Sequence, residues 1–346
     1  MINEKRLLDT FIGYAMIDSE TKNEKAMGEK LVEDLKALGL EVKTDKAGEG
    51  FGSNGFNVCA YLPGTIPGEP TIMCAHMDTV TPGNGIKPLI DDGIIHTDGS
   101  TILSGDDKSG IAAIMEAVKV IKEQNLPCRN TEILFTIGEE GGMNGVKNMD
   151  LSMIKGKEAM VFDASGDVGK ILTCGPGQIK IFATIIGRSS HAGLAPEEGI
   201  SAIQVAAKGI AKMNLLRIDE ETTCNIGTLK AEYATNIVPE KAEFVAEVRS
   251  RNLDKLNAQA AHMQKCLQDA CDEMGAKLEI ELKTNYVSFN VANDDPMVQR
   301  VCSLRAAGDP GLHRKGRRRK RRERNGPSRN QADRSLYRYD EGTYYG

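Results

Sequence analysis

Apolar and polar residues follow two different periods in the first half of the chain, and segments of the two kinds alternate. Residues 24–40 and 109–126 carry apolar side chains every three to four positions, which predicts amphipathic helices. Residues 56–64, 70–80 and 130–140 are short apolar runs that begin or end near Gly, Pro or Asn, which predicts strands. Strands that alternate with helices are typical of an α/β layer with a largely parallel sheet. We therefore expect an α/β fold in this half.

The order of elements changes after residue 178. A strand, a helix, two strands, a helix and a final strand are expected at 179–187, 200–215, 222–232, 241–250, 253–275 and 277–286. This βαββαβ order is the ferredoxin-like unit. We expect residues 179–288 to form such a domain, inserted into the first one.

The remaining residues complete this division. A chain of 346 residues is long enough for two domains, so residues 1–178 and 289–303 are expected to form the interrupted α/β domain. Residues 304–346 lack apolar periodicity and carry 13 basic and five acidic side chains, a net charge of +8 in a chain whose total is −5. The sequence predicts a disordered basic tail there.

The cysteines and the first residues of the chain indicate the cellular compartment in which the protein is expected. The eight cysteines are scattered through mostly apolar segments without a CxxC pair, which indicates reduced, buried thiols. The opening MINEKRLLDTFIGYAM has no long apolar core followed by a cleavage site, so neither a secretory signal nor a membrane span is predicted. A cytoplasmic location without membrane contact is expected.

Acidic residues and one histidine stand where several predicted strands or helices end or begin. They are His76 and Asp78 after one strand, Asp106 and Asp107 before a helix, Glu139 and Glu140 after a second strand, and Asp163 after a third. Any one of them alone would be a helix cap or a solvated turn residue. Functional groups gather beyond the carboxyl ends of parallel strands, and clustered carboxylates repel one another unless a cation is present. A histidine with several carboxylates suits zinc or a similar divalent metal.

Five motifs in this order resemble one family, the co-catalytic dizinc exopeptidases, and within it the peptidase T-like proteins. They are CAHMDTV, TDGSTILSGDDKSG, TIGEEGG, VFDASGDVG and RSSHAGLAPEEG, and the resemblance covers roughly residues 1–300. It implies a zinc-exopeptidase catalytic domain whose inserted ferredoxin-like domain serves as a lid and forms a homodimer.

The resemblance also implies four metal ligands. His76 and Asp163 would hold the first zinc ion and Glu140 the second, while Asp106 would bridge both. In the family, the peptide bond that follows the bridging aspartate is typically cis.

Further residues correspond to catalytic and substrate-binding positions of the family. Glu139 matches the general base, and Asp78 matches the carboxylate that orients the imidazole of the first ligand. His191 resembles a histidine that reaches the neighbouring subunit's active site and stabilises the oxyanion. Substrate carboxylate or carbonyl groups would be bound by Asn225, Asn236 and Arg249. Lys108 and Lys147 are expected to be solvated.

The chain departs from the family pattern near its end. The family's last ligand, a histidine on the second zinc, has no counterpart, and the second site is therefore expected to be incomplete. Read one nucleotide later with permitted codons, RSLYRYDEGTYYG can encode DLSIGMMKVHTT, which resembles the family's final segment with its histidine. The sequence thus suggests a frameshift between about Ser303 and Arg317, natural or introduced by sequencing.

The predicted function is hydrolysis of short peptides by metal-activated water, of the tripeptide-aminopeptidase kind. One alternative is an amidohydrolase that acts on N-acyl amino acids, because the motifs build the metal site and not the specificity pocket. Another is an inactive metal-binding homologue. Nucleic-acid binding through residues 314–324 is the weakest alternative, because the rest of the chain is acidic.

Overall fold

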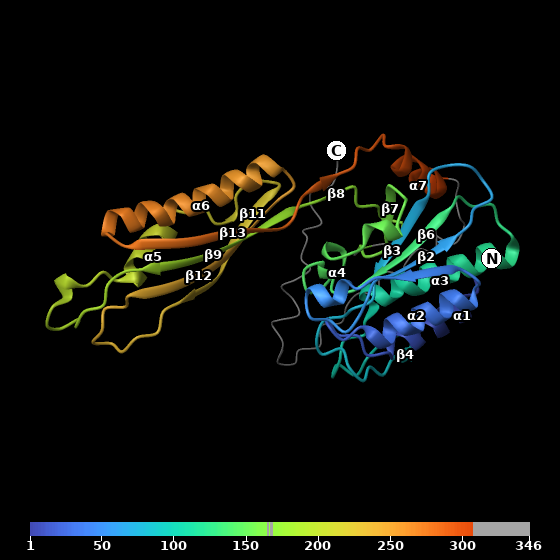
Figure 1. Cartoon of the computed structure of the whole chain (residues 1–346), viewed down its shortest axis with the longest axis horizontal. Helices are drawn as coiled ribbons and strands as arrows, with labels where there is room; N and C mark the ends of the chain where they lie inside the picture. The colour runs from blue at the N-terminus through green and yellow to red at the C-terminus, as the bar shows by residue number, and fades with distance from the viewer. Residues whose placement is uncertain (165, 167–168, 307–346) are drawn as a thin grey trace. The chain divides into compact units, whose positions relative to one another are not determined.

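A computed structural model describes residues 1–164, 166 and 169–306 (Figure 1). Backbone contacts divide the chain into residues 1–302 and 303–346. From residue 307 on, the predicted basic tail lies outside the described residues, so its disorder and the frameshift stay predictions.

The first sheet has five strands in the order β1-β2-β6-β3-β7. Their bounds are Glu41–Thr44, Val58–Leu62, Thr131–Thr136, Thr71–His76 and Glu158–Val161. β3 runs parallel to β6 and β7, whereas β2 is antiparallel to both β1 and β6. The sheet is therefore mixed. The predicted parallel character holds for β6, β3 and β7, whose carboxyl ends share one edge.

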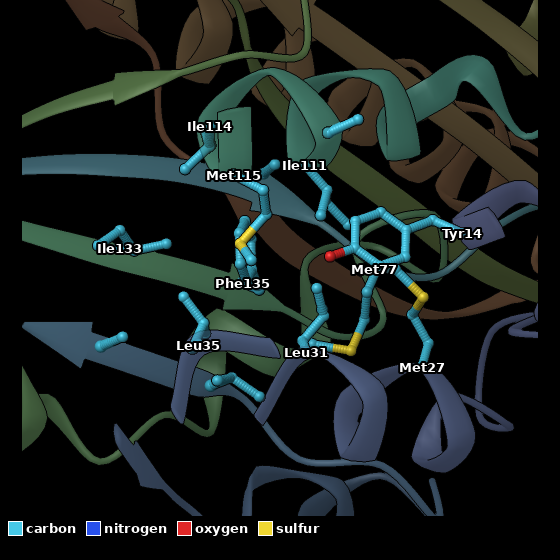
Figure 2. Packing of buried hydrophobic residues seen from close by; sticks show 14 of the residues in the cluster. Tyr14, Met27, Leu31, Leu35, Met77, Ile111, Ile114, Met115, Ile133 and Phe135 are labelled. Carbon is cyan, nitrogen blue, oxygen red and sulfur yellow. The ribbon is translucent and has the colours of Figure 1, made fainter. Parts of the chain in front are cut away.

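Three helices cover one face of this sheet and form its main core. They are α1 (Glu4–Ala15), α2 (Lys25–Ala37) and α3 (Gly105–Gln124). Figure 2 shows Leu31 and Leu35 of α2 and Met115 of α3 beside Phe135 of β6. Asn3 caps α1 by accepting a hydrogen bond from a backbone N–H in the first turn, and Gly39 takes the left-handed conformation after α2.

The second sheet has the order β10-β11-β12-β9-β13. Its strands span Leu216–Arg217, Thr222–Lys230, Lys241–Ser250, Gly177–Ile186 and Lys277–Tyr286. The helices α5 (Ala202–Ala211) and α6 (Leu253–Met274) pack with its inward-facing side chains in a separate apolar cluster. In chain order this is β9-α5-β11-β12-α6-β13, the predicted ferredoxin-like unit with the added short strand β10.

Short elements complete the described chain. They are the strand pairs β4 (Leu89–Asp91) with β5 (Ile94–His96) and β8 (Cys174–Gly175) with β14 (Phe289–Asn290), the helices α4 (Asn144–Lys147) and α7 (Pro296–Ala306), and 3-10 turns at Ala47–Gly50, Leu151–Met153 and Pro196–Glu198. None of the described helices combines the length and apolar character needed to cross a bilayer. All eight cysteines are free thiols, and only Cys302 among them is exposed.

Candidate metal centre

The parallel strands bring the predicted site residues to one edge of the first sheet. β3 ends at His76, β6 leads through two residues into Glu139 and Glu140, and β7 is followed after one residue by Asp163. Side chains at the carboxyl ends of adjacent parallel strands lie close together, and here they form one cluster.

His76 lies at the centre of this cluster and is almost completely buried. Its Nε2 is 2.9 Å from Asp106 Oδ1 and 3.8 Å from Asp163 Oδ1. On the other side of the ring, Nδ1 is 2.9 Å from the carbonyl oxygen of Asp78 and 3.4 Å from its carboxylate. The contacts to Asp78 fix the ring so that Nε2 faces the carboxylates.

Asp78 links the histidine to the two adjacent glutamates. Its fully buried carboxylate accepts hydrogen bonds from the backbone N–H groups of Glu139, at 2.9 Å, and Glu140, at 3.1 Å. The hydroxyl of Thr21 donates a third, at 2.8 Å. Burial opposes the charged form of Asp78, but the contact with His76 and its charge, together with the bonds from Glu139 and Thr21, lower the pKa of this carboxylate.

Asp106, at the start of α3, adds a carboxylate to those of Glu139, Glu140 and Asp163. Asp106 and Asp107 have non-helical backbone angles and are joined by a cis peptide bond. The Asp107 carboxylate is buried, 3.4 Å from the backbone nitrogen of His76. Gly110 makes room for it, because a Cβ there would lie 2.4 Å from Asp107 Oδ1.

The charges of this cluster are unbalanced. Burial and the charge of Asp106 raise the pKa of Glu140 to about 7. Burial, with a hydrogen bond to Asp106, raises that of Asp163 to about 7 as well, against the attraction of His76. Burial opposes the charged form of His76, yet hydrogen bonds to Asp106 and Asp78 raise its pKa to about 11. The group therefore retains protons that a cation could replace.

The donor atoms fit a divalent metal. In two triplets the potential ligand atoms all lie within 4.8 Å of one another: His76, Asp106 and Glu140, and His76, Glu139 and Asp163. One imidazole with several carboxylates is a suitable set for zinc or a similar ion. Glu139, expected to be the general base, thus lies within reach of the same ion as the expected ligands.

The two residues that follow Asp106 in the sequence, Asp107 and Lys108, are both buried. Lys108 was expected to be solvated, but it is completely buried and its ammonium donates to the carbonyl oxygen of Ile17 at 2.6 Å. Burial lowers its pKa to about 8. Burial also raises the pKa of Asp107 to about 8. The expectation that Lys108 is solvated is wrong, because the irregular start of α3, which turns this residue inward, leaves no mark on the apolar pattern. Lys147 is exposed, as expected.

The remaining predicted residues lie at two ends of the second sheet. The loop after β9 holds His191, which forms a bridge with Ile237, while the next residue's N–H donates to the carbonyl oxygen of Asn236 at 2.9 Å. Near the opposite end, Arg249 Nε donates to Glu247 Oε1 at 2.9 Å, and Asn225 is the register partner of Glu247. Eight positions of β12 separate Arg249 from the end near His191, about 26 Å of extended chain.

Comparisons with known proteins agree with this arrangement. Residues 57–174 match the model of peptidase family M28, and residues 176–275 match that of the peptidase dimerisation domain of M20 enzymes. The uncharacterized protein YqjE of Bacillus subtilis is 42% identical over 299 residues, which cover 86% of this chain and 81% of that protein.

Two solved structures are similar over most of the chain. A tripeptidase from Staphylococcus aureus superposes with a TM-score of 0.86 at 39% identity, covering 89% of this chain and 83% of that one. The aminopeptidase PepT from Bacillus cereus gives a TM-score of 0.82 at 42% identity, covering 86% and 80%. With this identity over most of its length, the chain belongs to the peptidase T-like dizinc exopeptidases of the M20 and M28 type, a family of metal-dependent peptidases.

Proposed function

We propose that this protein is an aminopeptidase that removes the first residue of short peptides, tripeptides foremost. The observation that carries the proposal is the cluster of one imidazole and four carboxylates, Asp106, Glu139, Glu140 and Asp163, in two overlapping triplets at one sheet edge. The names of the similar structures, a tripeptidase and an aminopeptidase, favour peptides over N-acyl amino acids as substrates.

In this proposal His76, Asp106, Glu140 and Asp163 hold the metal. A bound divalent ion supplies positive charge that acidifies water and polarises the scissile carbonyl. Glu139 takes the proton from the attacking water on its carboxylate and passes it to the departing amine nitrogen. Asp78 keeps the imidazole oriented and holds the backbone of both glutamates.

Glu139→Gln tests the assignment of the base. Its kcat on an unblocked tripeptide should fall about 10³-fold, because the amide cannot accept the proton. Metal content, measured by plasma mass spectrometry, should stay that of the wild type, and an exposed control, Glu49→Gln, should behave as wild type. A tripeptide with an acetylated amino terminus and an N-acyl amino acid serve as further substrates. Rapid cleavage of either one would contradict the aminopeptidase assignment.

We further propose zinc as the native ion, with two ions per site in the family's manner and the second bound weakly in this chain. In this proposal the second ion has only Glu140 and a share of Asp106 as ligands, because the family's last histidine has no counterpart in the sequence. Zinc titration of the metal-free protein should then show one tight and one weak site per chain. Two equally tight sites would contradict the proposed weakness.

The second sheet is proposed to form a homodimer and to contribute His191 to the partner's site. The match to the peptidase dimerisation domain supports it. Mixing Glu139→Gln with His191→Ala tests it, because only a mixed dimer has a site with both residues intact. Random mixing should restore about a quarter of the wild-type activity. If His191 acts within its own chain, the mixture stays inactive.

Substrate carboxylate or carbonyl groups are assigned to Arg249, Asn225 and Asn236. Peptides with an amidated carboxyl terminus should lose affinity in the wild type but not in Arg249→Ala, if the guanidinium binds the carboxylate. The domain boundaries at 178, 288 and 303 and a cytoplasmic location are proposed with this function. The free thiols, four of which are buried, suit a reducing compartment.

A further inference from the structure

Four consecutive backbone N–H groups after β6 are held by buried side chains. This segment, the 137–140 turn, runs from Ile137 to Glu140. Asp78 accepts the N–H groups of Glu139 and Glu140, as described above. The N–H of Gly138 donates to Glu24 Oε1 at 3.1 Å, and that of Ile137 donates to Asn57 Oδ1, also at 3.1 Å. Side-chain acceptors thus satisfy every N–H of the turn.

The two additional acceptors are fixed in their own surroundings. Glu24 and Asn57 are both completely buried. Ser53 donates its hydroxyl to the second carboxylate oxygen of Glu24 at 2.5 Å. The Asn57 amide group donates to Asp45 Oδ2 at 2.8 Å and to the carbonyl oxygen of Gly145 at 3.0 Å. Neither side chain is free to follow the turn if the turn moves.

Close packing restricts the turn further. A Cβ at Gly145 would lie 2.1 Å from the carbonyl oxygen of Ile137, and a Cβ at Gly55 would lie 3.1 Å from the Ile137 side chain and 3.0 Å from that of Glu24. Space for the turn therefore depends on glycines at both positions. A side chain that left its hydrogen bond would leave a buried N–H unpaired, which costs about 1–3 kcal/mol.

We infer that Glu24 and Asn57 are positioning residues that hold the 137–140 turn, and with it the carboxylates of Glu139 and Glu140, in the geometry the reaction needs. Neither residue touches the cluster itself; each acts through the backbone immediately before the two glutamates. The inference rests on the proposed roles of Glu139 and Glu140. It adds Glu24 and Asn57, from two other parts of the chain, to Asp78 as residues that position the two glutamates.

The experiment compares Glu24→Ala with Glu132→Ala. Glu132 is a matched control: it is a buried carboxylate at the other end of β6, and it accepts hydrogen bonds from the backbone N–H groups of Lys155 and Gly156 at 2.8–3.0 Å. Glu24→Ala should lower kcat about 10–100-fold with little change in KM, and weaken zinc binding by a similar factor. Glu132→Ala should lower the thermal midpoint comparably yet keep kcat. Glu24→Gln, which retains an acceptor for Gly138, should stay within about fivefold of the wild-type kcat.

Hydrogen exchange of the metal-free protein gives a readout that does not depend on activity. The Gly138 amide should exchange faster in Glu24→Ala and remain protected in Glu132→Ala, which should instead expose Lys155 and Gly156. Ser53→Ala is a milder variant in case Glu24→Ala does not fold, and it should show the same changes to a smaller extent.

The outcomes separate this inference from the proposed function. If Glu139→Gln remains active, the proposed function fails. If Glu139→Gln is inactive while Glu24→Ala, or Ser53→Ala in its place, keeps the kcat of its control and a protected Gly138 amide, the positioning inference is overturned and the proposed function stands.

Discussion

Charged side chains are buried beside the first sheet and kept out of the core beside the second. Among the described residues, every buried Asp, Glu, Lys or His lies at or before Glu132. The buried polar side chains of the second sheet and its helix are uncharged, namely Gln178, Thr222, Ser250 and Gln259. Burying a charge is costly unless it is paired or hydrogen-bonded. Folding of the first region therefore includes a free-energy cost of burying charge that the second region avoids. Much of that cost arises around His76.

The strands show the same difference in their side-chain pattern. Residues of β12 alternate strictly between buried and more exposed positions, with Ala242, Phe244, Ala246 and Val248 facing the helices. All six residues of β6 are buried, and the chain then enters the 137–140 turn. Regular alternation builds a stable layer, whereas the chemical groups gather where the regular pattern ends. Chemistry and stability are thus assigned to different regions, and paired substitutions test that division.

The largest expected contrast is between Asp78→Ala and Ser250→Ala. Asp78→Ala keeps the backbone carbonyl that contacts His76 Nδ1, but it removes the carboxylate 3.4 Å from that nitrogen and the three hydrogen bonds which the carboxylate accepts, so kcat should fall about 10²–10³-fold. The Ser250 hydroxyl shares a buried hydrogen bond with that of Thr222 and accepts one from the backbone N–H of Asn252, so Ser250→Ala should cost about 1–2 kcal/mol of unfolding free energy without changing kcat. Steady-state kinetics and denaturant unfolding measure both. An equal loss of kcat in both variants would contradict the proposal that catalysis depends on the first region and not on the second.

The second contrast concerns the two apolar cores. Phe135 of β6 and Phe244 of β12 are both essentially inaccessible to solvent, so each Phe→Ala change should cost about 3–5 kcal/mol of unfolding free energy. Phe135 is the register partner of Ala75, next to His76, and its loss should also weaken zinc binding. Phe244→Ala should leave zinc affinity unchanged in calorimetric titration. A loss of affinity in both variants would show that the cores are not independent.

The regular parts of the fold were predictable because side-chain periodicity reports them directly. The ferredoxin-like order followed from alternating strands and two amphipathic helices, and the strand ends that carry His76, Glu139 and Asp163 followed from the polar residues that close apolar runs. The antiparallel pairing of β2 with β6 did not, because periodicity says nothing of strand direction.

The positioning residues could not be found in this way. Glu24 and Gly138 are 114 positions apart, and Asn57 and Ile137 are 80 apart. An isolated polar residue before a helix or at a strand start looks like a cap or a solvated group, so its burial becomes evident only in three dimensions. Lys108 was misjudged for the same reason. The proposed metal ligands could be named from the sequence because five motifs agreed, and a single buried acceptor offers no such agreement.

Glycine replacement gives a smaller contrast. Because a Cβ at Gly145 would lie 2.1 Å from the Ile137 carbonyl oxygen, Gly145→Ala must displace the 137–140 turn, at a cost of about 1–3 kcal/mol, and should lower kcat as well. A Cβ at Gly227, at the irregular pairing of β11, would have a single neighbour at 3.9 Å. Gly227→Ala should stay within about 0.5 kcal/mol of wild type. Thermal unfolding and kcat together check both variants, and an unchanged Gly145→Ala enzyme would contradict the rigid turn.

The smallest contrast is between two ion pairs and depends on pH. The Arg6 guanidinium lowers the pKa of the buried Glu116 carboxylate, and Lys208 with Lys212 lowers that of Glu273, which is about half exposed. A carboxylate with a lowered pKa stabilises the fold at pH values above its unfolded pKa, near 4.5. It loses that contribution as the pH falls through its folded pKa.

Glu116→Gln should therefore lower Tm at pH 7 by about 2–4 °C and match the wild type in strong acid. Glu273→Gln should change Tm by less than about 1 °C at either pH, because solvent screens an exposed pair. Equal Tm changes in the two variants would contradict the expectation that the buried ion pair contributes more to stability than the exposed one.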